Sequence, residues 1–435
     1  MRITRLASLA VGLTVVLAGC ANQAARQAGG AGEAQAASSH QLSRATDAVI
    51  STAQSRLRSS ATDWQAMDTL GGAYLQKVRE VGDPGYYPKV EALLRQALAH
   101  DPGDGQALTL MGSLALARHQ FRDALTWGQK AHAALPYSAP PLGVIVDADT
   151  QLGDYPAALA ACQQMVDTKP DLSSYARVSY LRELNGDIPG AISAMRMAVE
   201  AGGPVPENVA YTRMLLGTLY LNSGYPEQAA TQYQQTLSED PGYAPAIAGM
   251  GRVRAAEGRE AEAISLLKQA VQMYPQPDSV ITLGDLYAVT GDTRQARQTY
   301  DLARAEISLY QANGVDLDAE LALFELDHAG DLAAAAASAE QAMRDRPSVV
   351  TEDTVAWARY RRGDVQGAVQ ASRDALRLGT RDALFHYHAG VIEEAAGMSS
   401  AARTEFATAL AINPHFSLLY TQDATARLRA LGGAA

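Results

Sequence analysis

Cysteine is almost absent from this sequence. Only Cys20 and Cys162 occur among the 435 residues. Cys20 belongs to a processing signal described below, so Cys162 is left without a disulfide partner. We therefore expect Cys162 to be a buried, unreactive thiol and not a reactive one.

Recognisable catalytic signatures are lacking as well. The metalloprotease pattern His-Glu-x-x-His does not occur. Ser265-Leu-Leu-Lys268 matches the Ser-x-x-Lys of penicillin-interacting enzymes, but the accompanying Lys-Thr-Gly is missing. His386 and His388 are two residues apart, so on a helix they face opposite sides and cannot share a metal. We expect a protein that is not an enzyme, with no catalytic, cofactor-binding or metal-binding residues.

Basic residues are outnumbered by acidic ones. The chain has 36 Lys and Arg against 47 Asp and Glu, a net charge of −11. Losing Arg2 and Arg5 with an N-terminal signal would leave 34 basic residues and a net charge of −13. An acidic surface is repelled by nucleic acid and by anionic lipid headgroups. We exclude nucleic acid as a partner and interpret the charge mainly as a source of solubility.

Alanine is abundant, and part of it is periodic. Nine alanines follow one another at steps of 33 to 39 residues: Ala124, Ala158, Ala191, Ala229, Ala263, Ala296, Ala335, Ala368 and Ala402. All but the first have a glycine five residues upstream: Gly153, Gly186, Gly224, Gly258, Gly291, Gly330, Gly363 and Gly397. A fixed period near 34 residues indicates that one supersecondary unit is repeated.

Each unit is predicted to be a helix, a glycine turn and a second helix. Apolar residues recur at helical intervals on both sides of the turn glycine, which can adopt the left-handed backbone that ends a helix. The clearest unit contains Leu216, Gly217, Tyr220, Gly224, Ala229, Tyr233 and Pro241. Its small residues let two helices approach, and its proline ends the second helix. A coiled coil is excluded because glycine or proline interrupts the pattern about every 15 residues.

This Leu-Gly, Tyr, Gly, Ala, aromatic, Ala, Pro pattern resembles the tetratricopeptide repeat (TPR) family over residues 61–414. The resemblance implies an all-α fold, a right-handed superhelical solenoid of about ten helix-turn-helix repeats. We expect cap helices at residues 41–60 and within 415–435, the latter followed by a tail. Extra residues around Gly82–Tyr87 and a second helix lengthened to Asn313 predict local distortions.

The N-terminus resembles a bacterial lipoprotein signal. Arg2 and Arg5 precede the apolar run Leu6–Leu17, which has about a dozen residues, too few to span a bilayer. Leu-Ala-Gly-Cys20 follows, as in a lipobox. The resemblance implies that residues 1–19 are removed and that Cys20 is lipidated. An ordinary signal peptide with an incidental cysteine is the alternative.

The residues after the signal predict where the protein lies. Residues 20–40 hold the lipidated cysteine and a stretch of Ala, Gln, Gly and Ser that cannot pack, so we expect a disordered tether. Ala21 is not the aspartate that retains lipoproteins at the inner membrane. We expect a lipid-anchored envelope protein. It would lie at the outer membrane facing the periplasm in a Gram-negative host, or at the outer leaflet of the cytoplasmic membrane in a Gram-positive one.

The resemblance also places a candidate binding surface, because first helices line the concave side of such a solenoid. The register puts six large side chains inward, as candidate contacts for a protein or peptide partner: Tyr180, Arg252, Phe324, Trp357, Tyr360 and Tyr387. Exposed aromatics of this kind form binding hot spots. The alternative is that they fill gaps between repeats as ordinary core. No Lys and Asn clamp for a partner's C-terminal carboxylate is present at the matching positions.

Three functional interpretations follow. The first is a membrane-tethered scaffold or adaptor that binds an envelope protein in its concave groove, either an extended peptide or a helix. The second is an accessory lipoprotein for pilus, secretion-system or outer-membrane assembly. The third is an enzyme or a solute-binding protein, which the missing motifs disfavour. No cofactor is implied by any residue pattern.

Overall fold

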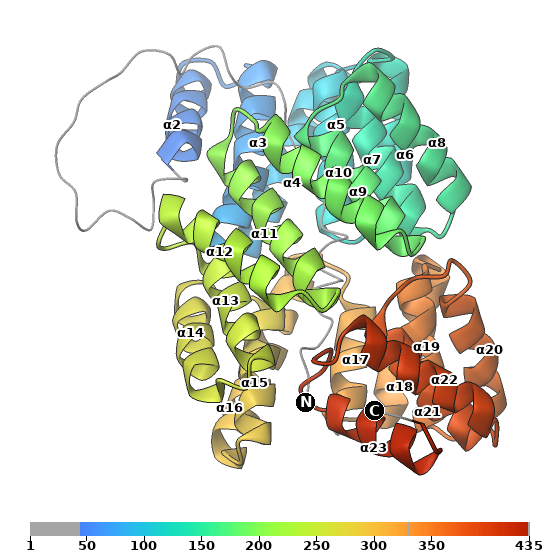
Figure 1. The fold of residues 1–435 in the computed structure, drawn as a ribbon. Coiled ribbons are helices and arrows are strands. Elements are labelled where there is room, and N and C mark those ends of the chain that lie inside the picture. The colour runs from blue at the N-terminus through green and yellow to red at the C-terminus, as the bar shows by residue number, and fades with distance from the viewer. Residues whose placement is uncertain (1–43, 329, 434–435) are drawn as a thin grey trace.

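The computed structural model describes residues 44–328 and 330–433, and Cys20 and the tether lie outside them. The described residues form α-helices, one short 3-10 helix and no strand (Figure 1). Ten helix pairs follow one another along the chain. Their first helices are α3 (Trp64–Val81), α5 (Gly105–Ala117), α7 (Ala139–Gln151), α9 (Leu172–Leu184), α11 (Pro206–Asn222), α13 (Ala244–Ala256), α15 (Pro277–Val289), α17 (Asp318–Asp327), α19 (Val349–Arg361) and α21 (Ala383–Ala395).

The second helices of the pairs return antiparallel to the first ones. They are α4 (Tyr87–His100), α6 (Phe121–Ala134), α8 (Tyr155–Thr168), α10 (Ile188–Ala201), α12 (Pro226–Glu239), α14 (Glu260–Met273), α16 (Thr293–Ala312), α18 (Leu332–Asp345), α20 (Val365–Ala375) and α22 (Ser399–Ile412). Helix α2 (Arg44–Ser59) precedes the pairs, and α23 (Thr421–Ala430) follows them. The 3-10 helix η3 (Pro84–Tyr86) lies at the extra residues of the first pair. The predicted all-α repeat solenoid is confirmed.

Small residues set the distance between the helices of a pair. The ladder alanines Ala229 and Ala263 are fully buried. A Cβ on Gly217 would lie 2.6 Å from the ring of Tyr233, and one on Gly390 would lie 2.7 Å from the ring of Phe406. A side chain at either glycine would therefore push the pair apart, which is why a small residue recurs opposite a large one.

The turn between the two helices of a pair needs a left-handed residue. Seven of the eight predicted turn glycines have a positive φ: Gly153, Gly186, Gly224, Gly258, Gly291, Gly363 and Gly397. His119 takes the same place ahead of Ala124, with φ 58°, and is the one non-glycine residue with positive φ in the described chain. Its ring nitrogen Nδ1 lies 2.8 Å from the carbonyl oxygen of Asp316. A contact from a distant repeat thus holds the strained backbone.

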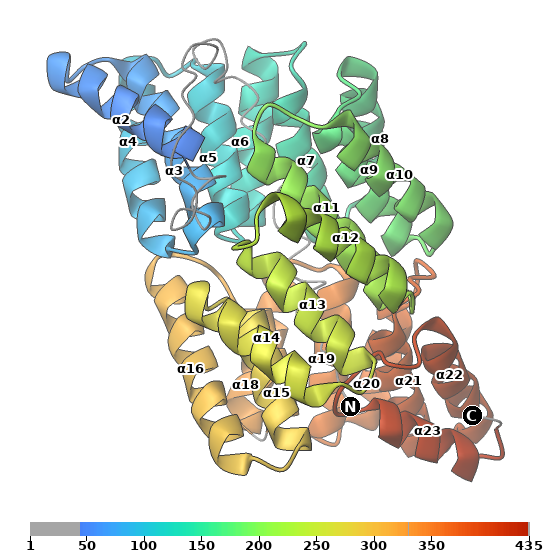
Figure 2. The ribbon, with the colours of Figure 1, turned by 60° about the vertical axis from the view of Figure 1, so that its left-hand side comes forward.

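Such contacts recur because the solenoid winds back onto itself. The loop entering each later unit meets the turn of the unit six places earlier. Val349 N donates to Tyr155 Oη at 2.8 Å, and Asn413 Nδ2 donates to the carbonyl of Leu221 at 3.0 Å. Figures 1 and 2 show α17–α22 lying beneath α5–α10 as a second superhelical turn. Repeats of simple solenoids contact only their neighbours. Here, in contrast, repeats of the two superhelical turns also form hydrogen bonds with each other.

Candidate ligand groove

Two adjoining cavities lie along the first helices of the N-terminal units. The larger, the α7 cavity, has a volume of about 590 Å³ and is lined by residues of α5, α7 and α9 and by the loop that leads to α11. The smaller, the α3 cavity, has a volume of about 480 Å³ and lies between α2, α3 and the N-termini of α5 and α11. They share five lining residues: Asp104, Gln106, Pro204, Val205 and Asn208. Together they form one groove.

The wall shared by the two cavities comes from an irregularity of the repeat. The step between Ala191 and Ala229 is 38 residues, longer than most. The added residues extend the loop after α10 and the start of α11, so that Pro204, Val205 and Asn208 reach the groove. Next to them, Glu207 accepts hydrogen bonds from Gln76 Nε2 at 2.9 Å and Arg79 Nη2 at 2.7 Å. The fifth unit is therefore fastened to the first across the concave side.

Three buried polar side chains face this shared wall. Asp68, Asp104 and Asn208 are 5%, 8% and 4% exposed, and all three line the α3 cavity. Asp104 caps α5, because its Oδ1 accepts from the backbone N–H groups of Gln106 and Ala107. Asp104 Oδ2, Asp68 Oδ1 and Asn208 Oδ1 accept no hydrogen bond from an amide, hydroxyl or cationic group of the described residues. Buried polar atoms are rarely left this way.

The two carboxyl groups hold a proton between them. Burial raises the pKa of Asp68 to about 8, and the neighbouring carboxyl of Asp104, with Asp101 further away, raises it in the same direction. Two neighbouring carboxylates repel each other when both are ionised, so one of them keeps its proton to a higher pH. At neutral pH Asp68 is therefore mostly protonated and donates to Asp104.

The cations of the groove are confined to the α7 cavity and are neutralised there. Arg177 forms two bonds with Asp147, Nε to Oδ1 at 2.9 Å and Nη2 to Oδ2 at 2.7 Å. Lys169 pairs with Asp171 at 3.0 Å. Among the described residues that line the α3 cavity there is no Lys, Arg or His. This half of the groove is therefore acidic.

A match to a known repeat family follows the same helix pairs. Residues 220–277 and 254–308 match a family model described as tetratricopeptide repeat, and these are the segments in which the pairs α11/α12 to α15/α16 alternate as the pattern requires. These residues are tetratricopeptide repeats. The ten pairs of the chain make it a long TPR array, as predicted.

Curated proteins and solved structures give more distant similarities. The chain is 26% identical over 230 residues to cellulose synthase 1 operon protein C of Komagataeibacter xylinus, a match that covers 52% of this chain and 15% of that protein. Human IFIT1, solved as a dimer with PPP-AAAA, is 12% identical with a TM-score of 0.45, covering 85% of this chain and 88% of that one. Yeast Tom70 is 11% identical with a TM-score of 0.39, covering 90% and 96%.

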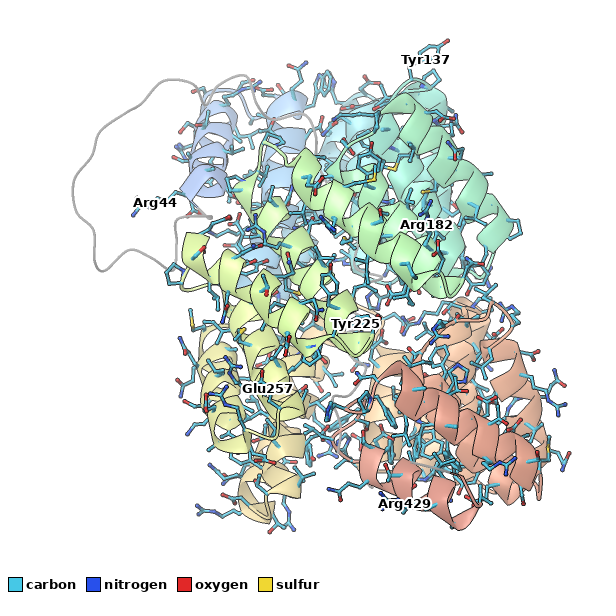
Figure 3. The ribbon with its side chains drawn as sticks, viewed as in Figure 1. Arg44, Tyr137, Arg182, Tyr225, Glu257 and Arg429 are labelled. Atoms are coloured by element: carbon cyan, nitrogen blue, oxygen red, sulfur yellow. The ribbon has the colours of Figure 1, made fainter. Side chains whose placement is uncertain are left out.

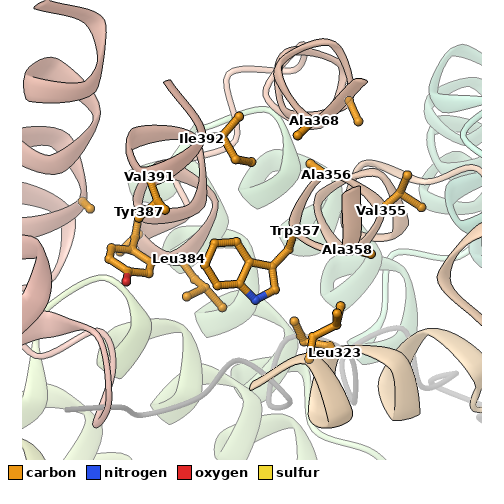
Figure 4. Close-up of a cluster of buried hydrophobic side chains, with 14 of the residues drawn as sticks. Leu323, Val355, Ala356, Trp357, Ala358, Ala368, Leu384, Tyr387, Val391 and Ile392 are labelled. Carbon is orange, nitrogen blue, oxygen red and sulfur yellow. The ribbon is translucent and has the colours of Figure 1, made fainter. Parts of the chain in front are cut away.

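The aromatic residues predicted to line the TPR groove are mostly core, which corrects that prediction. Phe324, Trp357 and Tyr387 are 1%, 3% and 3% exposed. Figure 4 shows Trp357 among apolar side chains that include Leu323 and Leu384. The segment around α23 covers Trp357 and Tyr387, whereas Phe324 packs between α15 and α16. The Tyr420 ring stacks on that of Tyr387, with centroids 4.5 Å apart.

The remaining predicted groove residues are also engaged within the fold. Arg252 is buried and forms an ion pair with Asp278. Tyr360 is half-buried and its ring stacks on that of Trp357 at 5.2 Å. Tyr180 is half-buried against a cluster that includes Phe385. None of the six predicted contact residues lines the α3 or α7 cavity.

The TPR register alone did not point to Asp68, Asp104 or Asn208. One signal was present: the long step before Ala229 marks an insertion on the concave side. Tyr137, in the loop between Leu135 and Ser138, is 95% exposed (Figure 3). Cys162 is buried, as expected, and burial raises the pKa of its thiol to about 11.

Proposed function

We propose that this protein is a lipid-anchored, non-enzymatic scaffold of the bacterial cell envelope, and that it binds a segment of a partner protein in the groove formed by the α3 and α7 cavities. The observation that carries the proposal is the groove itself, two adjoining cavities of about 590 and 480 Å³ along successive first helices. An extended peptide is the ligand whose shape suits a run of linked cavities on one face.

The α3 and α7 cavities both lie in the first superhelical turn. In the second turn the segment around α23 packs over Trp357 and Tyr387, and Tyr420 Oη donates to Asp327 at 2.6 Å. In the first turn Asp68, Asp104 and Asn208 line the α3 cavity, and each has a buried oxygen without an amide, hydroxyl or cationic donor among the described residues. A partner in this groove therefore meets polar side chains that the fold leaves without such a donor.

A groove-filling substitution tests this function. Gln106 is half-buried and lines both cavities, so Gln106→Trp fills their junction. We expect the partner to be recovered with the wild-type protein from detergent-solubilised membranes and to fall at least tenfold with Gln106→Trp. Gln234→Trp, at an exposed position on α12 outside the groove, should recover the partner normally. Equal recovery with both variants would place the contact elsewhere.

We propose that a lipid on Cys20 attaches the protein to the membrane, as the lipobox resemblance implies. None of the helices in the described ranges is long and apolar enough to cross a bilayer. Two acyl chains give stable anchoring, whereas one chain gives only marginal binding. We expect the wild-type protein to enter the detergent phase of a Triton X-114 separation and to incorporate labelled palmitate. Cys20→Ser should move to the aqueous phase without label. A variant that stays membrane-bound would show that the anchor is not at this residue.

A narrower role as an accessory protein of an envelope assembly is the second candidate. It is favoured by the 230-residue match to cellulose synthase 1 operon protein C. Under this role the partner recovered through the groove would be a component of a multi-protein envelope assembly. Recovery of an envelope protein that belongs to no such assembly would support the general scaffold role and contradict the accessory role.

A further inference from the structure

We propose that the α3 cavity binds the ammonium group of a lysine side chain carried by the bound segment, with Asp68, Asp104 and Asn208 as its three acceptors. The inference rests on the proposed function, because it specifies what the groove recognises.

The number and kind of acceptors match an ammonium ion. A lysine ammonium has three N–H donors and no acceptor. Asp68 Oδ1, Asp104 Oδ2 and Asn208 Oδ1 are three buried oxygens without such donors. A hard metal cation would require about six or more oxygen ligands, and no group of three His, Cys, Asp or Glu suited to a metal occurs in the described ranges.

The walls of the cavity match the rest of a lysine side chain. Val49, Trp64, Ala73 and Val205 contribute apolar surface around the carboxyl groups. Lysine packs its four-carbon stem on such surface while its charged end reaches polar partners. A free chain N-terminus has the same charged group but no stem, so it would leave these walls without contact.

Charge favours the same occupant. Asp68 and Asp104 are the charged lining residues of the α3 cavity that the structure describes, and both are acidic. Asp101 adds a further carboxyl near Asp68. On the α11 side, Glu207 is tied to Arg79, and at the end of α4 the His100 ring stacks on Trp64 at 6.1 Å. The cavity therefore attracts a cation and repels an acidic side chain.

Binding should be linked to proton release. Because the pKa of Asp68 is raised to about 8 in the unliganded groove, an ammonium ion must displace the proton that Asp68 shares with Asp104. Affinity should therefore rise with pH through this range, as long as the lysine itself stays charged, up to about pH 10. Asp68→Asn has no proton to release and should bind with little pH dependence in this window.

The three tryptophans of the chain provide the readout. Trp64 lines the α3 cavity, whereas Trp127 and Trp357 do not line either cavity. In the full-length lipoprotein in detergent micelles, labelled at the indole nitrogens, each tryptophan gives one NMR signal. The Trp64 signal is assigned by Trp64→Phe. The other two signals report any change that is not local to the cavity.

Three small probes separate the sources of the charged group. They are Nα-acetyl-lysine methylamide, its uncharged analogue Nα-acetyl-norleucine methylamide, and alaninamide, which carries only a chain-terminal amine. We expect the lysine probe to shift the Trp64 signal saturably, with a Kd on the order of 1 mM, and the other two to bind at least tenfold more weakly. Between pH 7.5 and 9.5 the affinity of the lysine probe should increase severalfold.

Matched variants test the residues. Asp68→Asn should weaken the lysine probe roughly tenfold at pH 9.5 and remove most of the pH dependence. Asp149→Asn, at another buried aspartate of a first helix outside both cavities, should change neither. Equal binding of the norleucine probe, tighter binding of alaninamide, or an unaltered Asp68→Asn titration would each overturn the inference. If the probe fails while Gln106→Trp still loses the partner, the proposed function stands and the ammonium site does not.

Discussion

Replacing Gly153 by alanine is expected to destabilise the protein by about 2 kcal/mol more than replacing Gly258 by alanine. Both glycines end a first helix with a positive φ, 75° and 72°. Both substitutions therefore carry the strain of a left-handed alanine, roughly 1–2 kcal/mol. They differ in their surroundings: a Cβ at Gly153 would lie 2.3 Å from the carbonyl oxygen of Pro347, whereas nothing lies within 4 Å at Gly258.

The difference between these two variants measures the contact between superhelical turns. Pro347 lies in the loop that enters the ninth pair, and Gly153 lies at the turn of the third. The Gly153→Ala side chain would displace the backbone carbonyl of Pro347. We therefore expect the variant to destabilise the ninth helix pair, in the second superhelical turn, as well as the third. Thermal unfolding by calorimetry, together with hydrogen exchange across α19–α21, checks this. Equal melting temperatures for the two variants would show that the contact between Gly153 and Pro347 does not contribute to stability.

Replacing Asp68 by asparagine is expected to make the protein more stable at high pH. The pKa of Asp68 is about 8 in the folded protein, against an ordinary value of 3.8. The folded state then holds a proton that the unfolded chain has released, so the free energy of unfolding falls as pH rises from about 4 to about 8. Asparagine keeps a donor toward Asp104 without this cost. The gain should be on the order of 1–3 kcal/mol at pH 9 and near zero at pH 4.

Asp149→Asn is the control for this pH dependence. Burial, together with the nearby Asp154, raises the pKa of Asp149 to about 6. Its stabilising effect should be complete by about pH 7, whereas that of Asp68→Asn should keep growing to about pH 9. Melting temperatures at pH 5, 7 and 9 separate the two curves. A flat difference between wild type and Asp68→Asn across this range would mean that the carboxyl pair does not share a buried proton.

Much of the fold could be read from the sequence because its determinants are local. The spacing of the turn glycines and the ladder alanines fixed ten helix pairs, and Gly217 opposite Tyr233 illustrates the packing behind it. Even the exception was visible, since Ala124 alone lacked its upstream glycine. The residue in that place, His119, adopts a positive φ and reaches Asp316 across the superhelical turn.

The groove could not be placed from sequence because it depends on contacts between distant units. Register put Trp357 and Tyr387 on the inner side, but it could not reveal that Tyr420 and its neighbours fold over them. Likewise, Asp68 and Asn208 are 140 positions apart in the sequence, yet they line the same cavity because the fifth unit packs against the first. These contacts between distant units depend on the pitch of the superhelix, which is set by many small packing differences along the chain.

Site-specific photo-cross-linking in living cells tests the central claim most directly. A benzophenone amino acid at Gln106, which lines both cavities, is compared with the same residue at Gln234 on the exposed side of α12. We predict that Gln106 gives one discrete adduct, linked through a lysine-containing segment of an envelope protein, and that Gln234 does not. Adducts of equal yield from both positions, or an adduct from Gln234 alone, would contradict binding in the groove.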